Sequence, residues 1–140
     1  GIGGRVIVNG ITYEVTETDP LQIYYHYSLK SYWQSQNSVT GKSNRIFGSG
    51  LRPCKIEPGK LVCSYATHYG NLTGAEAHNG LALEITPDVV HEVRPPPGTR
   101  IYFNPRAIPQ PNGTTGGLPE YIFPDGTPPG SVGPPRDIPP

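Results

Sequence analysis

The sequence predicts an α+β fold with a mostly antiparallel β core, few short helices and long loops. The chain has 140 residues, which suffices for one domain and leaves no room for a second catalytic domain. Its 18 glycines and 18 prolines favour turns and loops, whereas its nine tyrosines favour strands. An Asn-Gly dipeptide between two β-branched runs adds a strong hairpin signal. We therefore expect many short strands packed into a single domain.

The first elements follow from turn and capping residues. Residues 5–15, "RVIVNGITYEV", predict a β-hairpin because Asn9-Gly10 suits a tight turn with positive φ angles. A third strand is expected over 21–28, "LQIYYHYS". Ser28 would then cap a helix over 29–38, whose apolar face carries Leu29, Tyr32 and Trp33.

The middle of the chain alternates loops with short apolar runs. Residues 39–59 predict a polar loop with an apolar anchor at Ile46 and Phe47. Strands are expected over 60–67, 81–87, 99–105 and 119–123, the last of these being the final strand. A short helix or turn is expected over 72–80 with Gly80 as its C-cap, and 112–117, "NGTTGG", reads as the most flexible loop outside the tail.

The composition changes at residue 124. Seven of the last seventeen residues are proline and three are glycine, which excludes a helix or an inner strand. We therefore expect a single catalytic domain over 1–123 and an extended Pro/Gly-rich C-terminal tail over 124–140.

Charge is balanced overall but not along the chain. Eleven basic and eleven acidic residues cancel, so there is no bulk field to attract nucleic acid or a membrane. Between residues 30 and 60, however, only Glu57 opposes six basic residues, which form either an anion-binding face or a solvated loop. These basic residues are Lys30, Lys42, Arg45, Arg52, Lys55 and Lys60.

Two cysteines and the apolar runs bear on the compartment. Cys54 and Cys63 flank a Pro-Gly turn, and they would form a disulfide in an oxidising compartment or stay as thiols elsewhere. The apolar runs are too short for a membrane-spanning helix, and the first residues lack the pattern of a signal peptide. We expect the chain to be a fragment of a longer protein.

Three polar residues in strand-like contexts are candidates for one catalytic site. They are His26 in "YYHYS", Tyr65 in "CSYAT" and Glu120 in "LPEYI". Each also has an ordinary explanation: a satisfied half-buried histidine, a strand aromatic and an acid on the solvent face of an edge strand. Their order along the chain, with a Gly/Thr loop before the glutamate, is what distinguishes them.

This order resembles the ADP-ribosyltransferase fold, in particular the His-Tyr-Glu toxin domains at the C-termini of bacterial polymorphic toxins. The resemblance covers residues 21–123 and rests on short motifs. It implies a split antiparallel core with NAD in a cleft between two small sheets. His26 would bond a ribose hydroxyl, the backbone of Tyr27 would bind the nicotinamide amide, and Tyr65 would stack on the nicotinamide ring. Glu120 would hold the 2′-hydroxyl of the nicotinamide ribose.

The same resemblance assigns further roles and two departures. A basic residue such as Arg45 or Arg52 would meet the pyrophosphate. Arginine-modifying relatives carry Glu or Gln two residues before the catalytic glutamate, where this chain has Leu118, so arginine is disfavoured as the acceptor. Tyr27 stands where poly-ADP-ribosylating relatives have glycine, but a backbone contact tolerates the change.

The implied activity is cleavage of NAD and transfer of ADP-ribose to a protein or nucleic-acid acceptor. An NAD glycohydrolase shares every step up to the acceptor. By resemblance, the domain would be secreted or delivered by a secretion system, would act in the target-cell cytoplasm, and would be neutralised by a cognate immunity protein.

Three other functions compete with this one. A metal-independent ribonuclease would use a pair among His26, His68, His78 and His91, with Tyr65, Tyr69 or Lys60 nearby. A β-rich interaction module would use the Pro-rich tail as a ligand. A zinc site from Cys54, Cys63, His68 and His78 is weaker, because no Cys-x-x-Cys spacing occurs.

Overall fold

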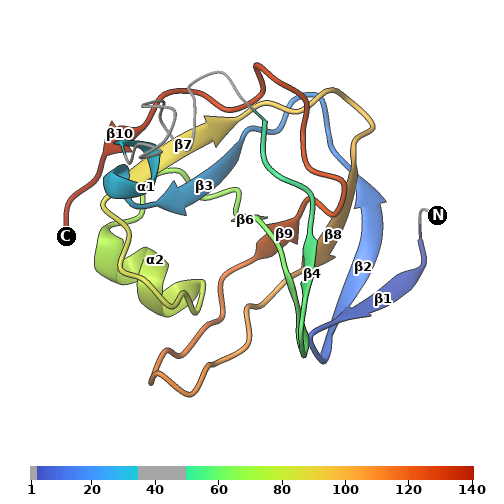
Figure 1. Cartoon of the computed structure of the whole chain (residues 1–140), viewed down its shortest axis with the longest axis horizontal. Coiled ribbons are helices and arrows are strands. Elements are labelled where there is room, and N and C mark those ends of the chain that lie inside the picture. Colours follow the sequence, from blue (N-terminus) through green and yellow to red (C-terminus); the bar gives the residue numbers. More distant parts are fainter. Residues whose placement is uncertain (1–2, 35–49) are drawn as a thin grey trace.

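The described part of the protein is built mainly of antiparallel strands with two short helices, which is compatible with an α+β fold. The computed structural model describes residues 3–34 and 50–140 (Figure 1). The strands are β1 (Arg5–Val8), β2 (Ile11–Glu17), β3 (Tyr24–Ser28), β4 (Lys55–Glu57), β5 (Lys60–Val62), β6 (Tyr65–Ala66), β7 (Val89–Val93), β8 (Arg100–Asn104), β9 (Glu120–Ile122) and β10 (Arg136–Asp137). The helices are α1 (Lys30–Gln34) and α2 (Gly74–Gly80).

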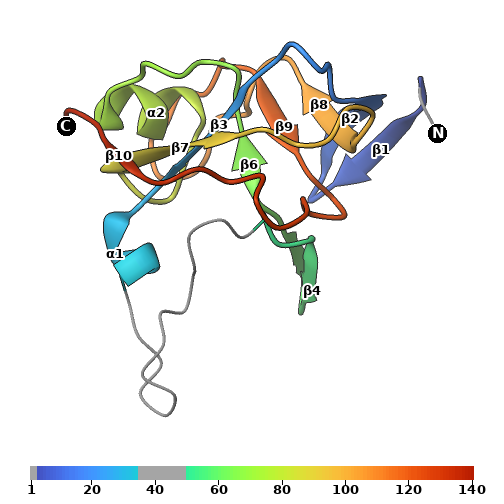
Figure 2. The ribbon, with the colours of Figure 1, turned by 90° about the horizontal axis from the view of Figure 1, so that it is seen from above.

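The strands form two main sheets and one separate hairpin. The five-stranded sheet has the order β1-β2-β8-β9-β6, the three-stranded sheet has the order β10-β7-β3, and β4 pairs with β5. Every strand pair among the described residues is antiparallel. The β4–β5 hairpin lies against one face of the five-stranded sheet (Figure 2).

In the part of the chain that the structure describes, a backbone bridge links β3 of the three-stranded sheet to Thr67, the residue after β6. Tyr25 and Thr67 exchange backbone hydrogen bonds of 2.8 and 2.9 Å. Edge strand β6 of one sheet is thereby placed beside edge strand β3 of the other. Side chains on either side of this bridge, from both sheets, can therefore face the same space.

Three clusters of apolar side chains hold these layers together. The first lies between the sheets and includes Tyr24, Phe123 and Val132. The second packs α2 against the three-stranded sheet through Ala77, Leu81, Tyr27 and Val90. The third lies between the five-stranded sheet and the β4–β5 hairpin, and its buried members are Val8, Tyr13 and Ile122.

The β-hairpin predicted for residues 5–15 is confirmed. Asn9 and Gly10 both have positive φ angles, 51° and 80°, as a tight two-residue turn requires. Val8 lies opposite Ile11 across this turn. The alternation of β2 then buries Tyr13 and Val15 and exposes Thr12 and Glu14.

The first helix differs from its prediction in its cap. Ser28 is the buried last residue of β3, and the backbone N–H of Lys30 is bound instead by the Asp88 carboxylate at 2.7 Å. Helix α1 covers Lys30–Gln34, and the expected remainder of the helix lies outside the described residues, as do Ile46 and Phe47. The expected loop over 39–59 contains strand β4 in its described part.

The strand expected over 81–87 is wrong. These residues turn the chain at the end of α2, where Leu81 N–H bonds to Ala77 O and Leu83 N–H to His78 O. Ala82 has a φ of 53°, which breaks an extended path. The strand of this region is β7, which begins at Val89, after the end of the expected strand, and the expected strand over 60–67 is divided into β5 and β6.

The C-terminal residues pack onto the domain. Strand β10 pairs with the edge of β7 and comes after β9, so the expected final strand is not the last one. Val132 is 1% exposed and belongs to the first cluster. Within the described residues, no helix is long and apolar enough to cross a membrane.

Candidate functional site

A small cavity lies where the two sheets meet. Its volume is about 100 Å³, and strands from both sheets contribute to its wall. The lining residues are His26 and Tyr27 of β3, Tyr65 and Ala66 of β6, Glu120 of β9, and Cys63, Leu81 and Leu83. The three residues expected to share a site, His26, Tyr65 and Glu120, are thus in one wall, together with Tyr27.

The strand registers explain how Tyr65 and Glu120 come together. Tyr65 pairs with Ile122 across β6 and β9. Side chains two residues apart on a strand point to the same face, so Glu120 and Ile122 share the face of Tyr65. That face is the one covered by the β4–β5 hairpin and the third cluster.

Glu120 is a buried carboxylate with two donors on one oxygen. Its residue is 6% exposed. The Tyr13 hydroxyl donates to Oε1 at 2.7 Å, and the Asn104 amide donates to the same oxygen at 3.2 Å. Burial raises the pKa of Glu120, and the two hydrogen bonds partly oppose this effect. The site therefore holds an acid whose charged form depends on those donors.

The tyrosines around Glu120 stay neutral at physiological pH. Burial raises the pKa of Tyr65, and the nearby charge of Glu120 raises it further. Burial and then the Glu120 charge raise the pKa of Tyr13 in the same way. Both side chains therefore offer neutral hydroxyl groups and aromatic surface to the site.

His26 has its ring orientation fixed by the neighbouring strand. Its Nδ1 lies 2.7 Å from the backbone oxygen of Tyr65. Because a carbonyl oxygen only accepts, Nδ1 carries the proton, and in the neutral ring Nε2 is the acceptor. His91 is the cross-strand neighbour of His26, with ring centroids 6.2 Å apart, and it is fully buried.

The other expected ligand contacts are distributed differently. The Tyr27 hydroxyl donates to Tyr69 O at 2.7 Å and accepts the Leu72 N–H at 3.0 Å, so its side chain ties β3 to the loop before α2. Arg52 is exposed and does not line the cavity. Arg45 lies outside the described residues.

The volume of the cavity limits what it encloses. Sites that bury a whole drug-sized ligand span roughly 300–1,000 Å³. At about 100 Å³, this cavity has room for one ring-sized group. A dinucleotide would place one end inside it and lie mostly over the surface around it.

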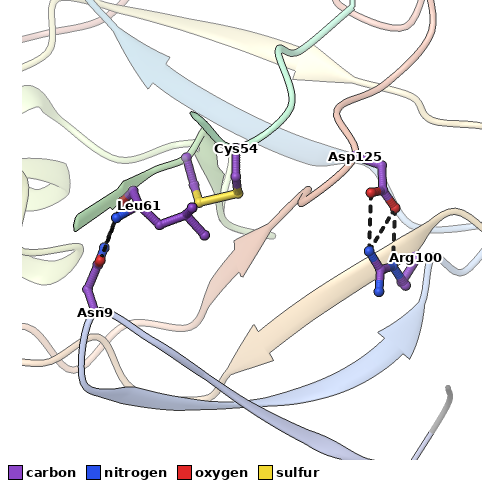
Figure 3. Close-up of a disulfide and its surroundings, with 6 residues drawn as sticks. Asn9, Cys54, Leu61, Arg100 and Asp125 are labelled. Carbon is purple, nitrogen blue, oxygen red and sulfur yellow. Dashed lines mark hydrogen bonds and ion pairs between the residues drawn. A yellow bond between two sulfur atoms is a disulfide. The ribbon is translucent and has the colours of Figure 1, made fainter. Parts of the chain in front are cut away.

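Cys54 and Cys63 form a disulfide at the base of the β4–β5 hairpin (Figure 3). Strand β5 of the hairpin is held by Asn9, whose amide group donates to Leu61 O and accepts from Leu61 N–H, each at 2.8 Å. The two cysteines of the alternative zinc site are therefore joined to each other and offer no thiolate ligand to a metal ion. Among the described residues, no group of three His, Cys, Asp or Glu side chains is placed to hold a metal ion.

The loop before β9 is held to α2 by hydrogen bonds. Asn79 bonds Thr115 through both its amide nitrogen and its amide oxygen, at 2.8 and 2.9 Å. Leu118 N–H bonds to Gly80 O, and the Leu118 side chain fills the space beside the Cα of Gly80. The glycines and threonines of 112–117 thus join α2 to the strand that carries Glu120.

Tyr13, Asn104, Leu81 and Leu83 were not identified from the sequence as parts of this site, and Cys63 was identified only as a disulfide or zinc-site candidate. Tyr13 and Asn104 occupy ordinary strand positions, and nothing local distinguishes them from neighbouring residues. The chain shows no significant similarity to any protein-family model, curated protein or solved structure with which it was compared.

Proposed function

We propose that the domain binds NAD, breaks the bond between nicotinamide and ribose, and transfers ADP-ribose to a macromolecular acceptor. The observation that carries this proposal is the grouping of His26, Tyr27, Tyr65 and Glu120 around one cavity. They come from three strands of two sheets. The resemblance to His-Tyr-Glu ADP-ribosyltransferases names these same residues for these roles.

The chemistry requires a fixed negative charge beside the ribose. Loss of nicotinamide gives an oxocarbenium-like transition state, whose positive charge is stabilised by a nearby carboxylate. The buried Glu120 carboxylate has little competing water around it, so its field at the ribose is strong. The electron pair of the breaking glycosidic bond goes to the ring nitrogen, so nicotinamide leaves as a neutral molecule.

The cavity suits the leaving group. A ring-sized space lined by the Tyr65 aromatic ring, Leu81 and Leu83 offers apolar walls to a planar ring. In this proposal the His26 ring, oriented by the contact of its Nδ1 with Tyr65 O, lies beside a ribose hydroxyl. The remainder of NAD lies outside the cavity.

The acceptor is a protein side chain other than arginine, or a nucleic-acid group. Leu118 stands two residues before Glu120, where it packs against Gly80 and supplies no carboxylate to activate an arginine. Water as the acceptor would make the domain an NAD glycohydrolase. We further propose a toxin that is secreted or delivered by a secretion system into a target-cell cytoplasm, with an immunity protein that covers the cavity.

The ribonuclease alternative is less well supported by the geometry. The structure places His26 and His91 side by side, and His91 is fully buried. A phosphodiester therefore could not reach both rings. A noncatalytic module would not require a buried acid that lines a cavity.

The test is nicotinamide release from NAD, measured by chromatography. The purified domain should release nicotinamide, and Glu120→Gln should lower the rate by on the order of 100-fold or more, as expected for loss of an electrostatic transition-state contact. Glu14→Gln is the matched control, because Glu14 is an exposed acid on β2. Labelled NAD incubated with cell lysate then separates transfer to protein or nucleic acid from hydrolysis. NAD that stays intact in every lysate and buffer would refute the proposal.

A further inference from the structure

The carboxylate of Glu120 is held asymmetrically. Tyr13 Oη and Asn104 Nδ2 both donate to Oε1, at 2.7 and 3.2 Å. In the described part of the chain, no hydrogen bond reaches Oε2. Since Glu120 also lines the cavity, one oxygen is anchored by the protein and the other remains for a ligand.

We propose that Tyr13, assisted by Asn104, is a positioning residue that holds Oε1 of Glu120 so that Oε2 accepts the hydrogen bond from a ribose hydroxyl. This inference rests on the proposed function, because it assigns the substrate-facing oxygen of the same site. Tyr13 itself does not touch the substrate.

The physical basis is the freedom of a glutamate side chain. The last torsion of glutamate has a broad, two-fold profile, so an unanchored carboxylate rotates between orientations. A hydroxyl on a rigid ring with only two side-chain torsions is an effective anchor, provided that the ring is itself fixed. Tyr13 is 1% exposed and packs in the third cluster with Val8 and Ile122. Its bond to Oε1 is charge-assisted and short.

The anchor also affects the protonation of Glu120. Burial raises the pKa of Glu120, whereas the hydrogen bonds from Tyr13 and Asn104 lower it, since they favour the ionised form. Among the described residues, the titratable groups that bond Glu120, feel its charge or line the same cavity are Tyr13 on β2, Tyr65 on β6 and His26 on β3. Loss of the Tyr13 hydroxyl should therefore move the titration of Glu120 to higher pH.

The position of Tyr13 gives the N-terminal hairpin a function. Tyr13 lies on β2, which pairs with β8, and β8 pairs with β9 through Asn104 and Glu120. Both donors thus lie on strands of the same sheet as Glu120. The hairpin predicted from Asn9-Gly10 carries one of them.

The test is Tyr13→Phe, which removes the hydroxyl and keeps the ring. The matched control is Tyr102→Phe, which removes a hydroxyl from the same apolar cluster without a bond to Glu120. We expect Tyr13→Phe to lower kcat for nicotinamide release by about tenfold or more and to shift the acidic limb of its pH profile upward by about one unit. Tyr102→Phe should leave both unchanged. Circular dichroism and thermal melting check that both variants are folded.

A second measurement does not need NAD. The carboxyl carbon of Glu120, assigned in NMR spectra by its absence in Glu120→Gln, reports the titration midpoint directly. Tyr13→Phe should raise this midpoint, and Asn104→Ala should raise it less because its hydrogen bond is longer. An unchanged midpoint and pH profile in folded Tyr13→Phe would overturn the inference. If the wild type does not cleave NAD but the midpoint moves, the proposed function fails while the anchoring of Glu120 stands.

Discussion

Reduction of the Cys54–Cys63 disulfide should destabilise the domain by a calculable amount. The bond joins residues nine positions apart and encloses the β4–β5 hairpin. Opening it restores conformational freedom to the unfolded chain. A loop of this length corresponds to about 9 cal/mol/K, or about 2.6 kcal/mol of stability at 25 °C.

The melting temperature converts this free energy into an observable. Unfolding entropy near the melting temperature is about 2.1 cal/mol/K per residue, which for the 140 residues gives about 0.3 kcal/mol/K. A loss of about 2.6 kcal/mol should therefore lower the melting temperature by about 9 °C. The assay is thermal denaturation followed by circular dichroism, with and without a phosphine reductant.

The control is a Cys54→Ser, Cys63→Ser double variant. Its melting temperature should match that of the reduced protein and should not change when the reductant is added. A fall of less than about 2 °C on complete reduction would refute the entropic reasoning, because the loop would then be equally restricted without the bond. Cys63 also lines the cavity, so nicotinamide release should decrease on reduction at temperatures where the reduced protein is folded.

Two further predictions concern Glu120 and the C-terminal residues. Burial raises the pKa of Glu120 above its usual 4.5, so the native state binds this proton more tightly than the unfolded state; stability should fall as pH rises from about 4.5 through the native pKa. Glu120→Gln should remove this slope and melt at or above the wild-type temperature at pH 7; a lower melting temperature would contradict it. Deleting residues 136–140 removes β10, half-buried Ile138 and the acceptor of Gly74 N–H, and should cost about 3 kcal/mol in urea denaturation. Deleting Pro140 alone is the control, and an equal effect of both deletions would exclude this explanation.

The parts of the fold that were predicted correctly depend on neighbouring residues. Asn9-Gly10 specifies its own turn, because the two residues themselves adopt the positive φ angles that a hairpin needs. Helix α2 begins at Gly74 after the N-cap Thr73, whose hydroxyl accepts from Glu76 N–H while the Glu76 carboxylate accepts from Thr73 N–H. Such signals need no knowledge of the rest of the chain. The C-cap of α2, in contrast, is Leu81 and not the expected Gly80.

The errors arise where distant contacts decide. Residues 83–86 alternate apolar and polar as a strand would, yet Leu81 and Leu83 serve the packing of α2 and the cavity wall. Strand β7 carries His91 and Glu92 among its valines, which conceals a strand paired on both sides. Strand β7 is the central strand of its sheet because β3 and β10 pair with its two sides.

The candidate site shows the same division. His26, Tyr65 and Glu120 were selected from the sequence, and the structure places them in one wall. Tyr13 was not selected, because its hydrogen bond to Glu120 joins residues 107 positions apart and leaves no local signal. Arg52 was selected for its charge alone, and it lies outside the cavity wall.

The hydrogen bond between Tyr13 and Glu120 also has a consequence for the folding of newly synthesised chains. A nascent chain that emerges N-terminus first must wait for β8 and β9 before Tyr13 meets its partner, so the acid cannot reach its final surroundings until nearly the whole chain is synthesised. Contacts of such long sequence separation slow folding, since a large loop must close before they form. An unfolded chain therefore contains His26, Tyr65 and Glu120 without the cavity that they line together in the folded domain.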